Sequence, residues 1–204
     1  LHMSLADRIN RGARKMPPWL LYILAPVPAL WWLWLGLTGG LGIEPIEALE
    51  HRLGEFALQL LILGLCVTPL RRHLGVNLIR FRRAIGLIAF FYVLLHLLVW
   101  LFLDVQIWSE IWADIVKRPY ITIGMAGFLL LIPLAVTSND LAVRKLGPVA
   151  WRRLHRLTYA AALLGGLHFV MLRKGFQLEP LVYLGIIAIL LALRIAPPSR
   201  RAAA

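Results

Sequence analysis

Four histidines lie within or beside apolar stretches of this sequence, where an ionisable side chain needs a chemical reason to be present. His96 and His168 lie deep inside such stretches, His155 lies near the start of one, and His51 lies just ahead of another. Imidazole nitrogens bind transition metals, exchange protons and form hydrogen bonds. Polar groups within membrane segments are costly and are functional candidates by default. The histidines are therefore the residues that the rest of the sequence has to explain.

The elements that carry these histidines are predicted to be membrane helices. The chain is 60% hydrophobic and has a mean hydropathy of +0.77, whereas soluble domains average about 45–50% apolar residues. Stretches of about 20 apolar residues span a bilayer, and six stretches reach or approach that length: 17–38, 53–70, 84–103, 119–137, 154–172 and 180–196. We predict an all-α membrane protein, a bundle of six transmembrane helices over residues 17–196. Pro26 and Pro28 predict a kink in the first helix.

The loop charges predict the orientation of this bundle. Lys and Arg are enriched in cytoplasmic loops of membrane proteins. One side of the predicted bundle holds most of the basic residues: Arg8, Arg11, Arg14, Lys15, Arg71, Arg72, Arg80, Arg82, Arg83, Arg144, Lys145, Arg152, Arg153, Arg194, Arg200 and Arg201. The other side holds Arg52, Lys117, Arg118, Arg173 and Lys174, together with most of the acidic residues. Both termini are therefore predicted to be cytoplasmic.

The segments outside the bundle are short. Residues 1–3 are expected to be a cloning remnant that ends at the start methionine, Met3. Residues 4–16 form a basic cytoplasmic N-terminus, and residues 197–204 form a cytoplasmic tail. Residues 107–118 are expected to form a short amphipathic helix on the outer surface. No internal repeat is visible in the sequence.

Charge and cysteine content exclude several classes of function. The net charge is +12, but the basic residues lie in loops between apolar runs and not along one face, so nucleic-acid binding is not expected. Cys66 is the only cysteine. A single cysteine excludes an internal disulfide, a cysteine-based metal site and covalent haem attachment.

Two of the histidines are predicted to lie at the same depth in the membrane. His96 is 12 residues beyond Ala84 and His168 is 14 residues beyond Leu154, which places them about 18 and 21 Å from the cytoplasmic ends of their helices. Imidazoles at matched depth on neighbouring helices can bind one iron from opposite faces, as in a b-type haem. The alternative is that each histidine bonds a backbone carbonyl across a helix interface. Zinc is disfavoured because no further ligand lies at that depth.

His155 lies at the cytoplasmic end of the fifth predicted helix, opposite Arg82 on the third. Arg82 precedes His96 by fourteen residues, which leaves it within about 40° of the same helix face. Arginine does not normally bind iron, since it stays protonated, but it holds propionates, phosphates and semiquinone anions. His155 and His168 are about 140° apart on an ideal helix. A bend at Gly165 and Gly166 would reduce that mismatch.

Several longer stretches resemble the ferric-reductase-like transmembrane family, and within it the haem-binding membrane subunits of bacterial periplasmic methionine sulfoxide reductase systems. The resemblance covers nearly the whole chain in order, and it rests on GLGIEPIEALEHRLGEFAL (40–58), LIRFRRAIGL (78–87) with His96, KRPYITIGMAGF (117–128), LAVTSN (134–139), RKLG (144–147) with the following LHRLTY, and His168. Oxidase members of the family carry a histidine at the position of Arg82 and a soluble flavin and nicotinamide domain, and this chain has neither.

The resemblance implies a set of cofactors and residue roles. It implies one or two b haems and a flavin mononucleotide (FMN). His96 and His168 would be the axial haem ligands. His155 and Arg82 would shape a cytoplasmic-side site for FMN, quinone or a second haem. His51 would orient a haem propionate or face a partner protein.

The resemblance also implies a place in an electron-transfer chain in the bacterial inner membrane. Electrons would come from the quinol pool or from a cytosolic flavin reductase. They would leave to a periplasmic molybdopterin-containing catalytic subunit that reduces methionine sulfoxide in oxidised periplasmic proteins. The chain itself would then need no complete catalytic site. The alternatives are a stand-alone transmembrane ferric or flavin-linked reductase, and a transporter that uses the histidines as a proton relay.

Overall fold

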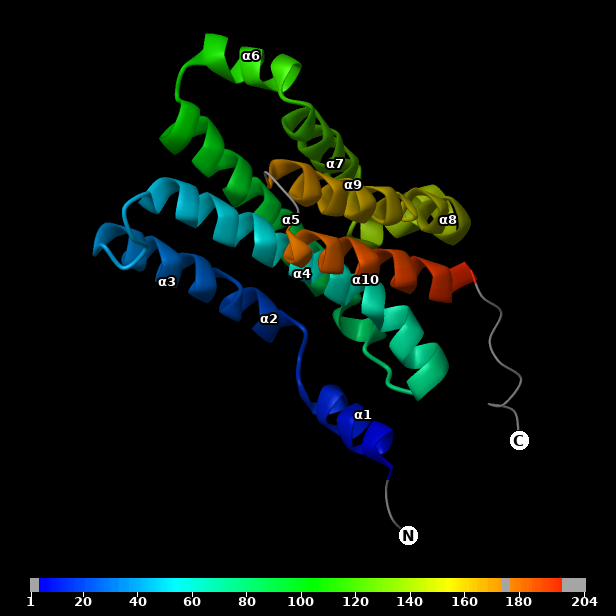
Figure 1. Cartoon of the computed structure of the whole chain (residues 1–204). Helices are drawn as coiled ribbons and strands as arrows, with labels where there is room; N and C mark the ends of the chain where they lie inside the picture. Colours follow the sequence, from blue (N-terminus) through cyan, green and yellow to red (C-terminus); the bar gives the residue numbers. More distant parts are fainter. Residues whose placement is uncertain (1–3, 174–176, 196–204) are drawn as a thin grey trace.

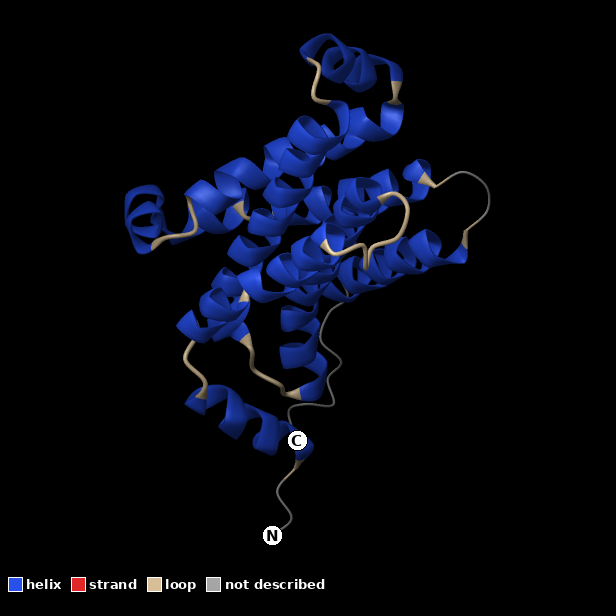
Figure 2. Cartoon of the chain, turned by 90° about the vertical axis from the view of Figure 1, so that its left-hand side faces the viewer, coloured by secondary structure: helices blue, strands red, loops and turns tan. Residues whose placement is uncertain are grey.

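A computed structural model describes residues 4–173 and 177–195. The expected cloning remnant at residues 1–3, Lys174 and the tail at residues 197–204 lie outside the described residues. Within the described ranges every regular element is a helix (Figure 2). The prediction of an all-α protein is therefore confirmed for this part of the chain.

The helices follow one another with short connections. In chain order they are α1 (Leu5–Lys15), α2 (Trp19–Leu24), α3 (Pro26–Leu37), α4 (Pro45–Leu74), η1 (Ile79–Phe81), α5 (Arg82–Val99), the π-helix η2 (Trp100–Val105), α6 (Trp108–Lys117), α7 (Pro119–Val136), α8 (Asp140–Leu154), α9 (Leu157–Leu172) and α10 (Leu178–Ile195).

In the part of the chain that the structure describes, four helical segments are long and apolar enough to cross a membrane: Trp19–Leu37, Pro45–Leu74, Ile79–Val105 and Pro119–Val136. They correspond to the first four predicted spans. The helix of the fifth predicted span, α9, is apolar but has only 16 residues. The number of six spans and the cytoplasmic placement of both termini stay predictions.

The long helices run in alternating directions, so the bundle has two ends (Figure 1). At the α6 end, α4, α7 and α10 begin, and α3, η2 and α9 finish. At the opposite end, called here the α1 end, α1 lies beside the turn between α4 and α5. The closest packing is within two helix pairs, α4 with α5 and α7 with α9. These two pairs face each other across the centre of the bundle, and α10 packs on α9 and α4.

The predicted kink at Pro26 and Pro28 is confirmed, because the first span is divided into α2 and α3 at Ala25. Tyr92 of α5 fills this break. Its hydroxyl donates to the Ala25 carbonyl (2.6 Å) and accepts from the Ala29 N–H (3.2 Å). A continuous helix would join that N–H and that carbonyl directly. The Tyr92 side chain is fully buried, so the bridge satisfies two main-chain groups where water is excluded.

The α1 end is held together by polar contacts of the basic segments. The Asn10 side chain of α1 donates to the Gly75 carbonyl (2.9 Å) and accepts from the Asn77 N–H (2.7 Å). Arg83 and Asp140 form an ion pair of 2.6 Å between α5 and α8. The hydrogen bond and charge of Arg83 hold the pKa of the Asp140 carboxyl below its usual value.

Two expectations about the fifth helix are wrong. The helix does not bend at Gly165 and Gly166, which lie inside the regular α9. The break lies instead at residues 155–156, between α8 and α9, so His155 and His168 belong to different helices. Gly166 serves helix packing instead of a bend, because a Cβ there would lie 3.0 Å from the Ile187 side chain of α10.

The predicted amphipathic helix at residues 107–118 is confirmed as α6. Its tryptophans, Trp108 and Trp112, are 76% and 69% exposed, whereas Ile111 on the opposite face is buried against the bundle. Exposed tryptophans on one face suit the boundary between lipid and water.

Candidate functional site

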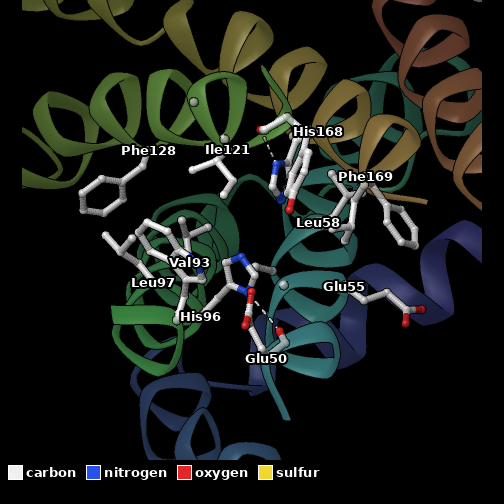
Figure 3. A pocket seen from close by; sticks show the side chains of 18 of the residues that line it. Glu50, Glu55, Leu58, Val93, His96, Leu97, Ile121, Phe128, His168 and Phe169 are labelled. Carbon is white, nitrogen blue, oxygen red and sulfur yellow. Dashed lines mark hydrogen bonds between the residues drawn. The ribbon is translucent and has the colours of Figure 1, made fainter. Parts of the chain in front are cut away.

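His96 of α5 and His168 of α9 face each other in the centre of the bundle, near the α6 end (Figure 3). Their ring centroids are 6.2 Å apart and their ring planes are inclined by 77°. The two residues come from different closely packed helix pairs, α4–α5 and α7–α9, so the packing of these pairs sets their separation. The structure thus brings together the two histidines that the sequence places at matched depth.

Each ring is fixed by one hydrogen bond to the main chain of the partner helix in its own pair. The Nδ1 of His96 lies 2.9 Å from the Glu50 carbonyl of α4, and the Nδ1 of His168 lies 2.7 Å from the Tyr120 carbonyl at the start of α7. A carbonyl only accepts, so Nδ1 carries the proton in both rings. The Nε2 atoms are then unprotonated, and neither has a hydrogen-bond partner among the described residues.

The two interpretations of these histidines from the sequence therefore coexist in the structure. The cross-helix bond to a carbonyl is present, but it uses only one nitrogen of each ring. A metal-binding histidine typically donates its second ring N–H to a carbonyl or a carboxylate, which fixes the tautomer and the ring orientation. Both histidines have this arrangement, with a free Nε2 each.

The histidines line a cavity of about 330 Å³ between the two helix pairs. Cofactor and ligand pockets are typically about 300–1,000 Å³. The walls are mostly small or apolar and come from α4, α5, α7 and α9; they include Gly54, Ala57, Leu58, Leu61, Val93, Leu97, Ile121, Gly124, Gly127, Phe128, Leu131, Ala161, Gly165 and Phe169. Glu55, the one acidic residue well inside a span, also lines it, and its carboxylate accepts from Tyr183 (2.8 Å) and Gln59 (3.0 Å).

Charged residues surround the cavity at the α6 end: Glu47, Glu50, His51, Asp104, Arg118 and Arg173. Arg173 follows α9 directly, and its guanidinium lies 5.7 Å from the Phe169 ring centroid. Its Nε is buried and has no hydrogen-bond partner within residues 4–173 and 177–195. Arg118 caps the start of α7 and pairs with Asp114 (3.0 Å). In the sequence both arginines stand out only as loop charges. Their positions immediately beside two spans were the signal that could have identified them.

The donor set suits a metal whose other ligands come from a macrocycle. Among the described residues no group of three or more His, Cys, Asp or Glu side chains could hold a metal ion, whereas a protein zinc site usually needs three or four such ligands. Two metal–imidazole bonds in line, at about 2.0 Å each, and the two ring radii together span roughly 6 Å. The 6.2 Å between the ring centroids matches this span. Two axial nitrogens, an apolar cavity and arginines at its mouth fit a haem with its carboxylates.

The second predicted site is built differently. His155 caps the C-terminus of α8, outside the apolar helix α9, and stacks on Trp151 with ring centroids 3.9 Å apart. Its Nε2 lies 3.0 Å from the Thr137 hydroxyl. The Thr137 hydroxyl donates its proton to the Pro133 carbonyl (2.6 Å). It therefore accepts a hydrogen bond from the Nε2–H of His155. Burial and, secondarily, the positive charge of Arg82 lower the pKa of His155.

The structure thus separates His155 and Arg82 from the paired histidines. Neither residue lines the central cavity, whereas His51 does. The Nε2 of His155 is occupied by Thr137, in contrast to the free Nε2 atoms of His96 and His168. The charge of Arg82 acts on His155, since it contributes to the lowered pKa of that ring; a shared cofactor site of the two residues stays a prediction.

Comparison with known proteins identifies the group to which this architecture belongs. The family model described as "Ferric reductase like transmembrane component" matches residues 53–166, more than half of the chain. The chain belongs to this family. The matched residues include His96 and His155, and the match ends just before His168.

Within the ferric-reductase-like family, the chain is similar to proteins named as the haem-binding subunit MsrQ of protein-methionine-sulfoxide reductase. The protein of that name from Agrobacterium fabrum is 51% identical over 182 residues, which cover 89% of this chain and 84% of the relative. The relative from Brucella anthropi is 47% identical and that from Brucella ovis 48% identical, each over 184 residues, 90% of this chain and 83% of the relative. The similarity to these relatives therefore extends well beyond residues 53–166.

Proposed function

We propose that this chain is a haem b-binding electron-transfer subunit that supplies electrons to a methionine sulfoxide reductase. The observation that carries the proposal is the pair of opposed imidazoles, His96 and His168, each with Nδ1 bonded to a carbonyl and Nε2 free toward a shared cavity. The relatives named as haem-binding subunits of such a reductase support the same assignment.

The chain's own residues would hold the haem and set its surroundings. His96 and His168 would bind the haem iron through their Nε2 atoms, and the apolar walls would exclude water from the cavity. Arg118 and Arg173 at the α6 end would offer positive charge to the haem carboxylates, and His51 would offer a ring N–H as a hydrogen-bond donor. The haem supplies reversible one-electron chemistry when bound.

The membrane arrangement follows from charge and helix length. We propose six spans in the bacterial inner membrane, with α9 and α10 as the fifth and sixth and both termini in the cytoplasm. The basic residues that gather at the α1 end support this orientation, since positive loops are cytoplasmic. The haem cavity then lies near the periplasmic side, where a periplasmic molybdopterin-containing catalytic subunit can receive electrons.

A second site at the α1 end would receive the electrons from the donor, either quinol or a cytosolic flavin reductase. His155 lies at the α1 end and does not line the cavity that His168 lines, so the cytoplasmic surface needs a redox group of its own. Arg82 and His155 would hold the anionic part of FMN or of a quinone there. Because the Thr137 hydroxyl occupies the His155 Nε2, a second haem is disfavoured against FMN or quinone at this position.

Cofactor content tests the proposal. The protein purified from membranes in mild detergent should show a Soret band that shifts on reduction. A pyridine haemochrome assay with protein quantitation should give one haem per chain, and acid-released flavin should be measured on the same sample. A protein expressed with adequate haem supply that contains no haem would refute the proposed function.

Two substitutions at the α1 end should separate the donor site from the haem site. Arg82→Gln and His155→Ala are expected to keep full haem content, since neither residue lines the cavity, and to lose flavin or quinol-driven haem reduction. Stopped-flow reduction of the haem by a quinol analogue or by reduced flavin measures the effect. Arg144→Gln, an exposed arginine of the same end on α8, serves as the matched control. Loss of haem in either variant would instead place His155 and Arg82 in the haem site.

A further inference from the structure

Two glycines occupy equivalent positions against the paired histidines. Gly54 of α4 lies against the His96 ring, and Gly124 of α7 lies against the His168 ring. A Cβ added at Gly54 would lie 3.0 Å from the Nδ1 and 3.1 Å from the Cε1 of His96. A Cβ added at Gly124 would lie 2.8 Å and 3.0 Å from the same atoms of His168. Ordinary carbon contacts are about 3.5–4.0 Å, so a methyl group at either position would force the imidazole ring to shift, and more so at Gly124.

Each glycine is four residues beyond the carbonyl that holds the ring. Gly54 follows Glu50, and Gly124 follows Tyr120. In an α-helix the carbonyl of one residue accepts the N–H of the residue four positions on, and the Cβ of that later residue tilts back toward the helix N-terminus. A side chain at the later position would therefore cover the carbonyl. Glycine leaves the carbonyl open to a second donor, the imidazole N–H.

We propose that Gly54 and Gly124 are positioning residues that let each imidazole reach its carbonyl and so aim its Nε2 at the haem iron. This inference rests on the proposed haem function and deepens it. It assigns the same device, a carbonyl followed four residues later by a glycine, to both ligand-bearing helix pairs. The two halves of the site are thus a structural repeat, although the surrounding sequences, EHRLG and YITIG, share only the glycine.

Two other glycines of the α4–α5 pair lack such a contact. A Cβ at Gly64 of α4 would meet Ile85 at an ordinary 3.7 Å, and a Cβ at Gly86 of α5 would meet nothing within 4 Å. Glycine is a poor helix former, so an alanine at position 64 or 86 is expected to be tolerated or stabilising. Gly64→Ala and Gly86→Ala are therefore matched controls for the two positioning glycines.

The test is the state of the haem in Gly54→Ala and Gly124→Ala. Both variants should lose haem to an excess of a haem scavenger about 10-fold or more faster than the wild type, the usual size of an effect on residues that orient metal ligands. Electron paramagnetic resonance of the oxidised haem should show altered low-spin signals, and the reduced haem should bind carbon monoxide once one imidazole is displaced. Gly124→Ala should have the larger effect, because its ring contact is tighter.

A double-variant experiment distinguishes ring positioning from simple helix packing. Alanine at residue 124 clashes with the His168 ring, so Gly124→Ala should cause no additional loss of yield or thermal stability when His168 is already alanine. The same holds for Gly54→Ala in the His96→Ala protein. An additional loss in these backgrounds would show that the glycines serve helix packing alone, and would overturn the inference.

The outcomes also separate this inference from the function on which it rests. If His96→Ala and His168→Ala lose the haem but the two glycine variants behave like Gly64→Ala and Gly86→Ala, the haem function stands and the positioning role fails. If the wild-type protein binds no haem, the proposed function itself fails.

Discussion

Replacement of either His96 or His168 by alanine is expected to remove the Soret band of the purified protein almost completely. Each ring supplies one of the two opposed Nε2 atoms in the cavity, and among the described residues no group of three or more His, Cys, Asp or Glu side chains could hold a metal ion in their place. Loss of a residue that merely orients a ligand costs about 10–100-fold in metal affinity, and loss of the ligand itself should cost more. Haem per chain, measured by pyridine haemochrome assay, should fall equally in both variants.

His73→Ala is the matched control for these two substitutions. His73 lies in the last turn of α4 at the α1 end, is exposed, and does not line the cavity. The haem content of the His73→Ala protein should equal that of the wild type. Haem and imidazole added together to the His168→Ala protein should partly restore the low-spin spectrum, since the vacated space has the size of the missing ring. Full haem content in His96→Ala or His168→Ala would contradict the ligand assignment.

Tyr92→Phe is expected to destabilise the protein by about 2 kcal/mol, because a buried polar group left unpaired costs about 1–3 kcal/mol. The substitution keeps the ring packed between Trp32 and Phe56 but removes the hydroxyl that joins the Ala25 carbonyl to the Ala29 N–H. Reversible unfolding in mixed micelles measures the free energy. Hydrogen exchange should show faster exchange at Ala29 than in the wild type.

The matched control is Tyr22→Phe on α2, where the side chain is 40% exposed. Its unfolding free energy should stay within about 0.5 kcal/mol of the wild type, as for most surface substitutions. Equal stability of Tyr92→Phe and the wild type would show that the break between α2 and α3 does not depend on the hydroxyl bridge.

The positions of the two central histidines along their helices were enough to predict that they meet. Apolar runs mark the helices, the loop charges give alternating directions, and a rise of about 1.5 Å per residue converts sequence position into depth. Pro26 and Pro28 likewise predicted the break that the structure shows at Ala25. These features are local, so the sequence expresses them directly.

The break before α9 could not be predicted in this way. Residues 154–157 contain neither glycine nor proline, and both His155 and Arg156 keep backbone angles close to helical values. Gly165 and Gly166 suggested a bend because glycine is a poor helix former. Whether a helix bends at a glycine depends on the residues that pack against it, which the local sequence does not show. The side chains of Ile187 and Leu184 of α10 pack against Gly166, so this glycine provides room for a neighbouring helix.

The charged mouth of the cavity could be predicted only in part, because the positions of Arg118 and Arg173 beside two spans single them out but do not show that they share one space. Arg118 and Arg173 are 55 positions apart and meet the cavity only because α7 begins where α9 ends. The burial of the Arg173 Nε and its position beside the Phe169 ring and the cavity are visible only in the structure. The loop charges taken by themselves contain no information about which of them face a shared space.

The acceptors that fix the two imidazoles belong to the main chain, and this gives the site an unusual evolutionary freedom. No substitution at residue 50 or 120 deletes a carbonyl, so the tautomer of each histidine is insensitive to the side chain found there. Glu50 and Tyr120 can then change in response to other demands, such as the charge at the cavity mouth or contact with a partner. The sequence then has to keep only a histidine on one helix and a glycine on the neighbouring helix. This requirement is simple enough to use in a designed helical hairpin.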